Sequence, residues 1–135
     1  MKRTAPQQYF NACSTGKPII VEEYLSRGVD PEARDSNHLT GLIWSGRKGR
    51  IEVAQVLLTH GANVNAGDIR NRTALFHAVT YNRYDYVNFL AAVGAHLNII
   101  DSHGWSALDF AISSRSIKMV ELLKSLGAKS GKHET

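Results

Sequence analysis

The sequence has one cysteine, three prolines and no long hydrophobic run, and these shortages exclude several classes of protein. A single cysteine, Cys13, excludes an intramolecular disulfide framework and any zinc site built from several cysteines. No apolar stretch approaches the roughly 20 residues of a membrane span, and the basic N-terminal segment lacks the continuous apolar core of a signal peptide. We therefore expect a cytoplasmic protein, or a nuclear one in a eukaryote, without membrane association.

The composition of the 135 residues favours one folded domain covering residues 1–135. Hydrophobic residues make up 43% of the chain, which is too much for a mainly disordered protein and enough for a sizeable core. Sixteen Lys and Arg residues against twelve Asp and Glu residues leave a formal net charge of +4. This balance favours an acidic partner.

The chain repeats itself every 33 residues. The same interval separates aspartates at Asp35, Asp68 and Asp101, leucines at Leu42, Leu75 and Leu108, and glycines at Gly28, Gly61, Gly94 and Gly127. A fixed period of this length indicates a stacked repeat architecture, whose terminal units are atypical. We expect repeats at approximately 2–34, 35–67, 68–100 and 101–133.

Each unit predicts two short helices joined by a polar turn. In the third unit, apolar residues from Ala74 to Val79 recur at helical spacing, and a second apolar stripe runs from Tyr84 to Leu90. The first helices should begin after the capping residues Thr40, Thr73 and Ser106, and the run from Ser106 to Asp109 is typical of a capping box. Pro18 marks the start of a second helix. The turn column of the extended connections holds His38, Asn71 and Gly104, which tolerate left-handed backbone.

Two stretches carry a resemblance to a known family. They are the run DIRNRTALFHA from Asp68 to Ala78 and the run LLTHGANVN from Leu57 to Asn65. Both are similar to the ankyrin-repeat signature, D-x-x-G-x-T-P-L-H-x-A followed by L-L-x-x-G-A-x-V-N. The resemblance implies an all-α repeat solenoid, an ankyrin stack of helix-turn-helix units joined by β-hairpin loops. The Pro and His of T-P-L-H are absent from every unit, so local rigidity could differ from the family's.

Polar residues replace apolar ones only in the first and last units, as end caps would require. Glu23 stands in the column of Val56, Phe89 and Leu122. At the other end, Lys124 and Asp109 replace apolar residues of the preceding units. We therefore expect a complete four-unit stack with solvent-facing ends and a frayed tail from Lys129 onward.

No motif supplies the chemistry of an enzyme. The sequence contains no H-E-x-x-H, G-x-S-x-G or phosphate-loop pattern. His60 is expected to be structural, His77 to lie in the core or a pocket, and Cys13 to be a small buried residue. His38 and His103 lie in non-adjacent units, too far apart to share a metal. We predict no catalytic residues, no cofactor and no metal; an enzyme would need side chains from separate repeats to converge in a pocket.

The resemblance implies a non-enzymatic protein–protein interaction module with a concave binding surface formed by hairpin tips and first helices. Nine residues stand in the columns that the family leaves free for partners or beside them: Leu39, Arg47, Lys48, Ile69, Arg70, Arg72, Tyr81, His103 and Trp105. Tyr, Trp and Arg are enriched at interface hot spots, and no fold requirement explains Arg70 and Arg72. The alternative for Ile69 and Trp105 is packing against neighbouring hairpins.

The leading hypothesis is an adaptor or inhibitor that is monomeric when unbound and docks one protein partner, for which the charge balance favours an acidic surface. One alternative is a neutralising, immunity-type inhibitor of a specific toxin or enzyme. A nucleic-acid-associated protein using Arg47, Lys48, Arg70 and Arg72 is less favoured, because no aromatic-basic interleaving supports it. Arg50 and Arg83 are expected to lie in solvated turns.

Overall fold

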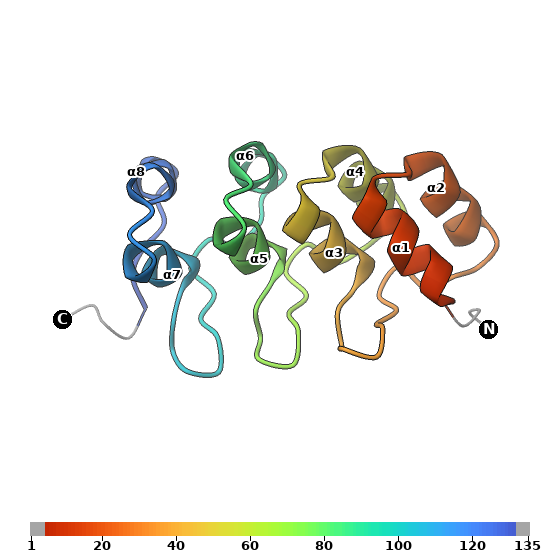
Figure 1. The fold of residues 1–135 in the computed structure, drawn as a ribbon, viewed down its shortest axis with the longest axis horizontal. Coiled ribbons are helices and arrows are strands. Elements are labelled where there is room, and N and C mark those ends of the chain that lie inside the picture. Colours follow the sequence, from red (N-terminus) through yellow and green to blue (C-terminus); the bar gives the residue numbers. More distant parts are fainter. Residues whose placement is uncertain (1–4, 132–135) are drawn as a thin grey trace.

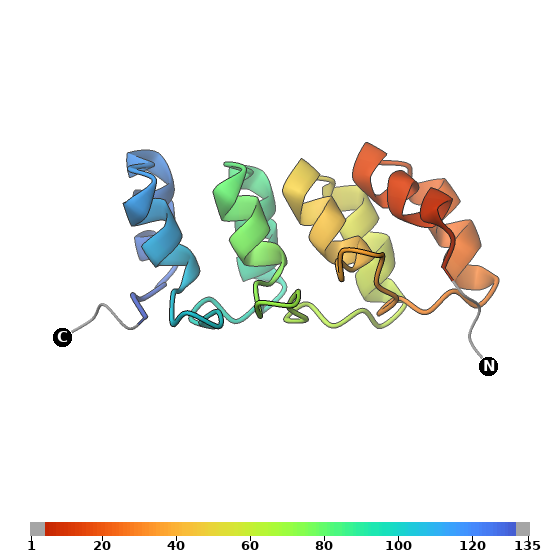
Figure 2. The ribbon, with the colours of Figure 1, turned by 60° about the horizontal axis from the view of Figure 1, so that its bottom comes forward.

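The computed structural model describes residues 5–131, which form a row of helix-turn-helix pairs (Figure 1). The helices of this part of the chain are α1 (Gln7–Thr15), α2 (Pro18–Ser26), α3 (Gly41–Lys48), α4 (Ile51–Thr59), α5 (Ala74–Thr80), α6 (Tyr84–Ala92), α7 (Ala107–Ser113) and α8 (Ile117–Ser125). The first helix of each pair lies in one layer and the second helix in another, and the long connections project on the side of the first layer (Figures 1 and 2). The prediction of an all-α repeat solenoid is confirmed. The helix pairs fall inside the expected repeats, whose boundaries and single-domain grouping stay a prediction.

The connections between pairs are tight hairpins, although residues 5–131 contain no regular strand. Each hairpin is closed by a backbone hydrogen bond from the recurring aspartate: the N–H groups of Asp35, Asp68 and Asp101 donate to the carbonyls of Leu39, Arg72 and Trp105 at 3.0, 2.9 and 2.8 Å. The turn column adopts the predicted left-handed backbone, with φ of 64° at His38, 63° at Asn71 and 82° at Gly104. The closing hydrogen bond and the left-handed turn residue therefore fix the backbone conformation of each hairpin.

Local chemistry explains where α2, α3 and α7 begin. The Thr40 hydroxyl accepts from the Ile43 N–H, and Ser106 and Asp109 form the predicted capping box. Pro18 occupies the first turn of α2, where its missing N–H is tolerated. Thr73 precedes α5 without a side-chain capping bond, so this part of the prediction is wrong.

The core runs through the stack as columns of residues 33 positions apart. Leu57, Leu90 and Leu123 are fully buried, and Cys13 is also inaccessible, as expected. Adjacent first helices approach closely at Gly46, where a Cβ atom would lie 2.9 Å from the Ala74 carbonyl oxygen. This close approach aligns the exposed ends of α3 and α5 along one face.

The two ends of the stack agree with the capping prediction at Glu23 and Lys124 but not at Asp109. Glu23 and Lys124 are exposed, and Glu23 pairs with Arg27 at 3.1 Å. Asp109, expected to face solvent, is 4% exposed, which corrects the prediction. Its carboxylate accepts from the Ser106 N–H, the Ser130 hydroxyl and the Gly131 N–H, so the chain after α8 folds back over it.

The first part of the tail is ordered by a contact that recurs between units. The Asn65 side-chain oxygen accepts from the His96 N–H at 2.9 Å, and the Asn98 oxygen accepts from the Lys129 N–H at 2.8 Å. The segment 129–131 therefore occupies the place of the next repeat's connection and is not frayed. The rest of the predicted frayed tail, residues 132–135, lies outside the described residues.

Candidate functional site

The predicted binding residues fall into two groups on the face formed by hairpins and first helices. Ile69 is 74% exposed and Tyr81 is 44% exposed. Arg70, His103 and Lys48 are also exposed, whereas Arg47, Arg72 and Trp105 are half-buried. Their surroundings decide which of them form one site.

Leu39 does not belong to this surface, because only 6% of it is exposed. Its side chain joins the core cluster, and its N–H donates to the Asp35 carboxylate at 3.0 Å. The prediction that Leu39 faces a partner is therefore wrong. An apolar residue next to the hairpin closure gains more by covering the core than by facing water.

Arg47, near the end of α3, lies between two aromatic rings. Its guanidinium carbon is 4.8 Å from the centroid of the Trp44 ring and 5.0 Å from that of Tyr81, and its Nη2 donates to the Tyr81 hydroxyl at 2.8 Å. Cation–π contacts of this kind are worth about 0.5–1 kcal/mol each at exposed sites. The stack joins the second and third units on the concave face.

The hairpin aspartates hold the side chains nine residues later on the first helices. Asp35 accepts from the Trp44 indole N–H at 2.7 Å, and Asp68 lies 3.0 Å from Nε2 of His77. Phe110 occupies the same column in the fourth unit and has no N–H group to donate. In the fourth unit, the hairpin aspartate Asp101 therefore needs a side-chain donor from another position.

In the fourth unit, Arg72 supplies the hydrogen-bond donor that Phe110 lacks. Its Nε donates to Asp101 at 3.1 Å, and its guanidinium lies over the Phe110 ring at 4.8 Å. The Asp101 side chain is 1% exposed, so this pair satisfies a carboxylate that would otherwise lose hydration. The expectation that no fold requirement explains Arg72 is therefore wrong, whereas the Arg70 side chain makes no contact of that kind with residues 5–131.

A cavity of about 200 Å³ opens where these elements meet. Its lining comes from the ends of α3 and α5, from α7 and from one hairpin: Arg47, Arg72, Phe76, His77, Thr80, Tyr81 and Phe110. Three predicted residues, Arg47, Arg72 and Tyr81, thus come together. Trp105 adjoins the cavity through Phe110, with ring centroids 5.6 Å apart.

The remaining candidates lie elsewhere. Ile69, Arg70 and His103 belong to the hairpins, outside the lining of the cavity. Lys48 lines a different depression, together with Arg83, Tyr84 and Lys118 at the turns between paired helices. The nine predicted residues therefore do not form one continuous site.

The electrostatics of the cavity depend on Asp68 and His77. Burial would raise the pKa of Asp68, but hydrogen bonds from the Arg72 and Arg70 N–H groups and from His77 together hold it below its ordinary value of 3.8. Burial lowers the pKa of His77 below 6.5, and the nearby charges of Arg47 and Arg72 lower it further against the opposing effect of Asp68. At neutral pH the lining of the cavity therefore includes a neutral imidazole and two guanidinium groups, and the Asp68 carboxylate lies beside it against His77.

The predicted binding residues leave out four members of the cavity, Phe76, His77, Thr80 and Phe110, although the sequence predicts His77 in the core or a pocket. They also leave out Trp44, which stacks on Arg47. Trp44, His77 and Phe110 occupy one column of the repeat. A usable signal was present, since an aspartate precedes each member of this column by nine residues.

The opposite edge of the molecule, at the turns within each pair, uses arginine differently. Arg50 Nε donates to the Ser14 carbonyl at 3.0 Å, and Arg83 Nε donates to the Arg47 carbonyl at 2.9 Å. Both acceptors lie in the last turn of a first helix, where carbonyls lack helical donors. Arg50 and Arg83 thus link adjacent units, which corrects the expectation that they occupy merely solvated turns.

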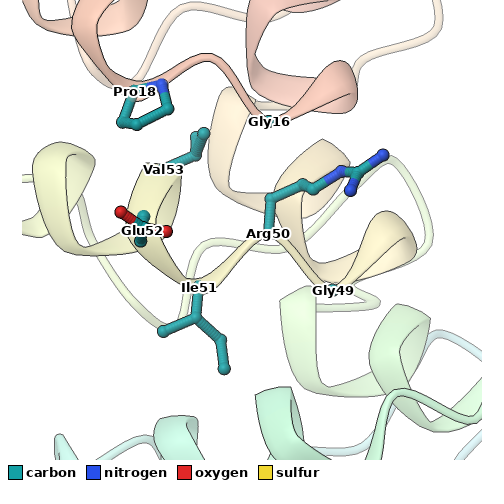
Figure 3. A pocket seen from close by; sticks show the side chains of 7 residues that line it. All are labelled: Gly16, Pro18, Gly49, Arg50, Ile51, Glu52 and Val53. Atoms are coloured by element: carbon teal, nitrogen blue, oxygen red, sulfur yellow. The ribbon is translucent and has the colours of Figure 1, made fainter.

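Arg50 also borders a depression of about 270 Å³ at this edge. Figure 3 shows Pro18 and Val53 on one side of it and Arg50 on the other. The Nε of Arg50 already donates to a backbone carbonyl, so the role assigned to Arg50 at this depression is to link two units.

Residues 5–131 contain no group of three His, Cys, Asp or Glu residues arranged to hold a metal ion. No helix in this range is long and apolar enough to cross a membrane. His60 has the structural role expected of it, because its Nε2 lies 2.6 Å from the Glu22 carboxylate and so connects α4 to α2.

Comparison with the models of known protein families gives a match. The model of a family described as ankyrin repeats, in three copies, matches residues 10–101, which is more than half of the chain. No curated protein matches it. The matched stretch contains α3 and α5 with their hairpins, whereas α7 and α8 follow it.

Proposed function

Since the chain belongs to the ankyrin-repeat family, a non-enzymatic fold of protein–protein interaction modules, we propose that it is an adaptor or inhibitor that binds one protein partner through its concave face. The concave face here means the surface formed by the hairpins and by α3, α5 and α7. The partner's identity is left to experiment.

The observation that carries this proposal is the row of aromatic and arginine side chains on that face. The Trp44–Arg47–Tyr81 stack continues through the cavity to Arg72, Phe110 and Trp105. Tyr81 remains 44% exposed, and Ile112 on α7 is 49% exposed. Tyr, Trp and Arg are enriched at interface hot spots, because Tyr and Trp combine large area with few rotamers to immobilise and Arg adds a planar fork of donors.

The scaffold around this row is already in place before binding. Neighbouring hairpins are linked by hydrogen bonds from the Asn71 side chain to the Ile100 carbonyl at 3.0 Å and from the Ser102 N–H to the Arg70 carbonyl at 2.9 Å. A preorganised surface loses little entropy on association. This property suits a tight inhibitor, including the neutralising, immunity-type inhibitor of a toxin or enzyme, as well as an adaptor.

The experiment compares a concave-face variant with a matched variant of the outer helices. Ile69→Ser with Tyr81→Ala changes the concave face, whereas Gln55→Ala with Asn88→Ala changes exposed positions on α4 and α6. Affinity capture with mass spectrometry would use all three proteins at equal concentration. We expect one partner to be captured by the parent and the outer-helix variant, and lost with the concave-face variant.

Loss of that partner with the outer-helix variant alone would contradict the proposal and move the binding surface to α4 and α6. The nucleic-acid alternative has less support, because its four cations do not gather on one surface. Arg47 and Arg72 line the cavity, whereas Arg70 lies on a hairpin outside it and Lys48 borders a different depression. A protein that binds nucleic acid presents its cations as a patch or stripe.

A further inference from the structure

We propose that the cavity between α3, α5 and α7 takes a single carboxylate side chain from an acidic segment of the partner, held by Arg47 and Arg72. This inference rests on the proposed function and deepens it, since it names the chemistry that the concave face would recognise. It follows from the hydrogen-bonding capacity, charge and size of the cavity.

Arg47 has donors that the protein does not use. Its Nη2 donates to Tyr81, but its Nε is buried and has no hydrogen-bond partner. No carboxylate in residues 5–131 forms a salt bridge with it. A buried donor without an acceptor is costly, and the half-buried guanidinium has no anionic partner, so an incoming carboxylate would supply the negative charge that this site lacks.

Arg72 presents the other part of the site. Its Nε is committed to Asp101, and the Phe110 ring fixes the plane of the guanidinium from one side. The two terminal nitrogens remain available, because the hydrogen bonds of the described residues do not use them. Guanidinium groups bind carboxylates well because their N–H groups lie in a fixed planar fork.

The carboxylates already present would not compete for these donors. Oδ1 of Asp68 accepts from the Arg70 and Arg72 N–H groups while Oδ2 meets His77. Oδ1 of Asp101 accepts from the His103 and Trp105 N–H groups, and Oδ2 accepts from Arg72. Both anions are satisfied locally and turned toward the hairpins.

The charges of Asp68 and Asp101 still determine which kind of ligand the cavity would bind. Two aspartates beside two arginines leave the cavity rich in donors but without a surplus of positive charge. A singly charged carboxylate suits such a site better than a doubly charged phosphate, which would meet stronger repulsion. Phe76 and Phe110, whose rings pack edge to face with centroids 5.7 Å apart, provide an apolar wall for the methylene groups of the side chain.

The test uses two acetylated and amidated pentapeptides, Gly-Leu-Glu-Leu-Gly and Gly-Leu-Gln-Leu-Gly, and inorganic phosphate. Each would be titrated into the full ¹⁵N-labelled chain at low ionic strength, and the arginine Nε–H and backbone signals would be followed by NMR. We expect the Glu peptide to shift the signals of Arg47, Arg72 and Tyr81, and to bind about tenfold or more tightly than the Gln peptide and phosphate.

Two variants with the same loss of charge complete the test. Arg47→Gln should weaken binding of the Glu peptide by about tenfold. Arg70→Gln, on the exposed hairpin, should change the affinity for this peptide by less than about twofold. Unchanged amide spectra away from the substitution would show that both variants are folded. Equal binding of the Glu and Gln peptides, equal or tighter binding of phosphate, or equal losses in the two variants would overturn the inference.

The captured partner separates failure of this inference from failure of the proposed function. If Ile69→Ser with Tyr81→Ala abolishes partner binding while Arg47→Gln and excess Glu peptide do not weaken it, the concave face binds but the carboxylate site is wrong. If the concave-face variant binds normally, the proposed function itself fails.

Discussion

Arginine has different roles on the two edges of this stack. At the turn edge, Arg50 and Arg83 give their Nε–H groups to carbonyls of the preceding unit. On the concave face, Arg47 lies between Trp44 and Tyr81, and Arg72 lies over Phe110. The first pair links one unit to the next through the backbone, whereas the second pair packs against aromatic rings where it lines the cavity between α3, α5 and α7.

The difference comes from what each guanidinium meets. First helices end at the turn edge with carbonyls that have no helical donor, and an arginine at the start of the next second helix reaches them. On the concave face the neighbouring groups are aromatic rings and carboxylates that are already hydrogen-bonded. The groups that each guanidinium meets, backbone carbonyls in one case and aromatic rings in the other, therefore separate structural arginines from candidate binding arginines.

The largest effect is expected in the core on which both edges depend. Leu90→Ala removes a fully buried side chain from the middle of the stack and should lower the free energy of unfolding by about 2–5 kcal/mol. Urea denaturation would measure this loss. A change below about 0.5 kcal/mol would mean that the leucine column is not the common core.

On the concave edge, Trp105→Ala should weaken partner binding by about 2 kcal/mol or more, which is a hot-spot effect. Calorimetry with the captured partner would measure it, and urea denaturation would measure stability separately. Because Trp105 packs on Phe110, we also expect a stability loss of about 1 kcal/mol. Unchanged affinity would place the binding surface away from the fourth unit.

The aspartates of the hairpins should stabilise the concave face. Asp68→Ala removes the acceptor for two backbone N–H groups and for His77, and should cost about 1–2 kcal/mol of stability because those donors are partly exposed. Urea denaturation would measure the loss. An equal loss from Asp85→Ala, at an exposed position on α6, would contradict this role.

The same aspartate should make the hairpin sensitive to acid. The pKa of Asp68 is held below 3.8 in the folded chain, so its contribution is present above that value and is lost as the pH falls through the folded-state pKa. Asp68→Asn should show a smaller loss of stability than the parent between neutral pH and the acid range. An identical acid dependence in both proteins would contradict this prediction.

The smallest effect is expected at the ends of the stack. Glu23→Ala and Lys124→Ala should each change stability by no more than about 0.5 kcal/mol, because both side chains are exposed. Thermal melts of the two variants would measure it. A larger loss would indicate that an end is covered by another copy of the chain.

Much of the fold could be predicted from the repeat itself. The helix starts at Thr40 and Ser106 and the left-handed turns at His38 and Asn71 follow from local backbone chemistry, which the residues at those positions determine. The period also located the leucine core. These features depend on neighbours within one unit or on identical positions in the next.

The rest depends on contacts between unlike positions of different units. The burial of Asp109 needs the tail to return over it, and the role of Arg72 follows from Phe110 lacking a donor. The cavity likewise exists because the ends of α3 and α5 meet α7. Sequence columns compare equivalent positions, so they do not indicate which side chains cross from one column to another.

The most direct test compares Arg47→Gln with Arg83→Gln, which remove equal charge from the two edges. Stability and affinity for the captured partner would be measured for both. We expect Arg47→Gln to weaken binding about tenfold with a stability change of at most about 1 kcal/mol, and Arg83→Gln to cost about 1–2 kcal/mol of stability with unchanged affinity. If both folded variants lost affinity equally, the division between a binding edge and a linking edge would be wrong.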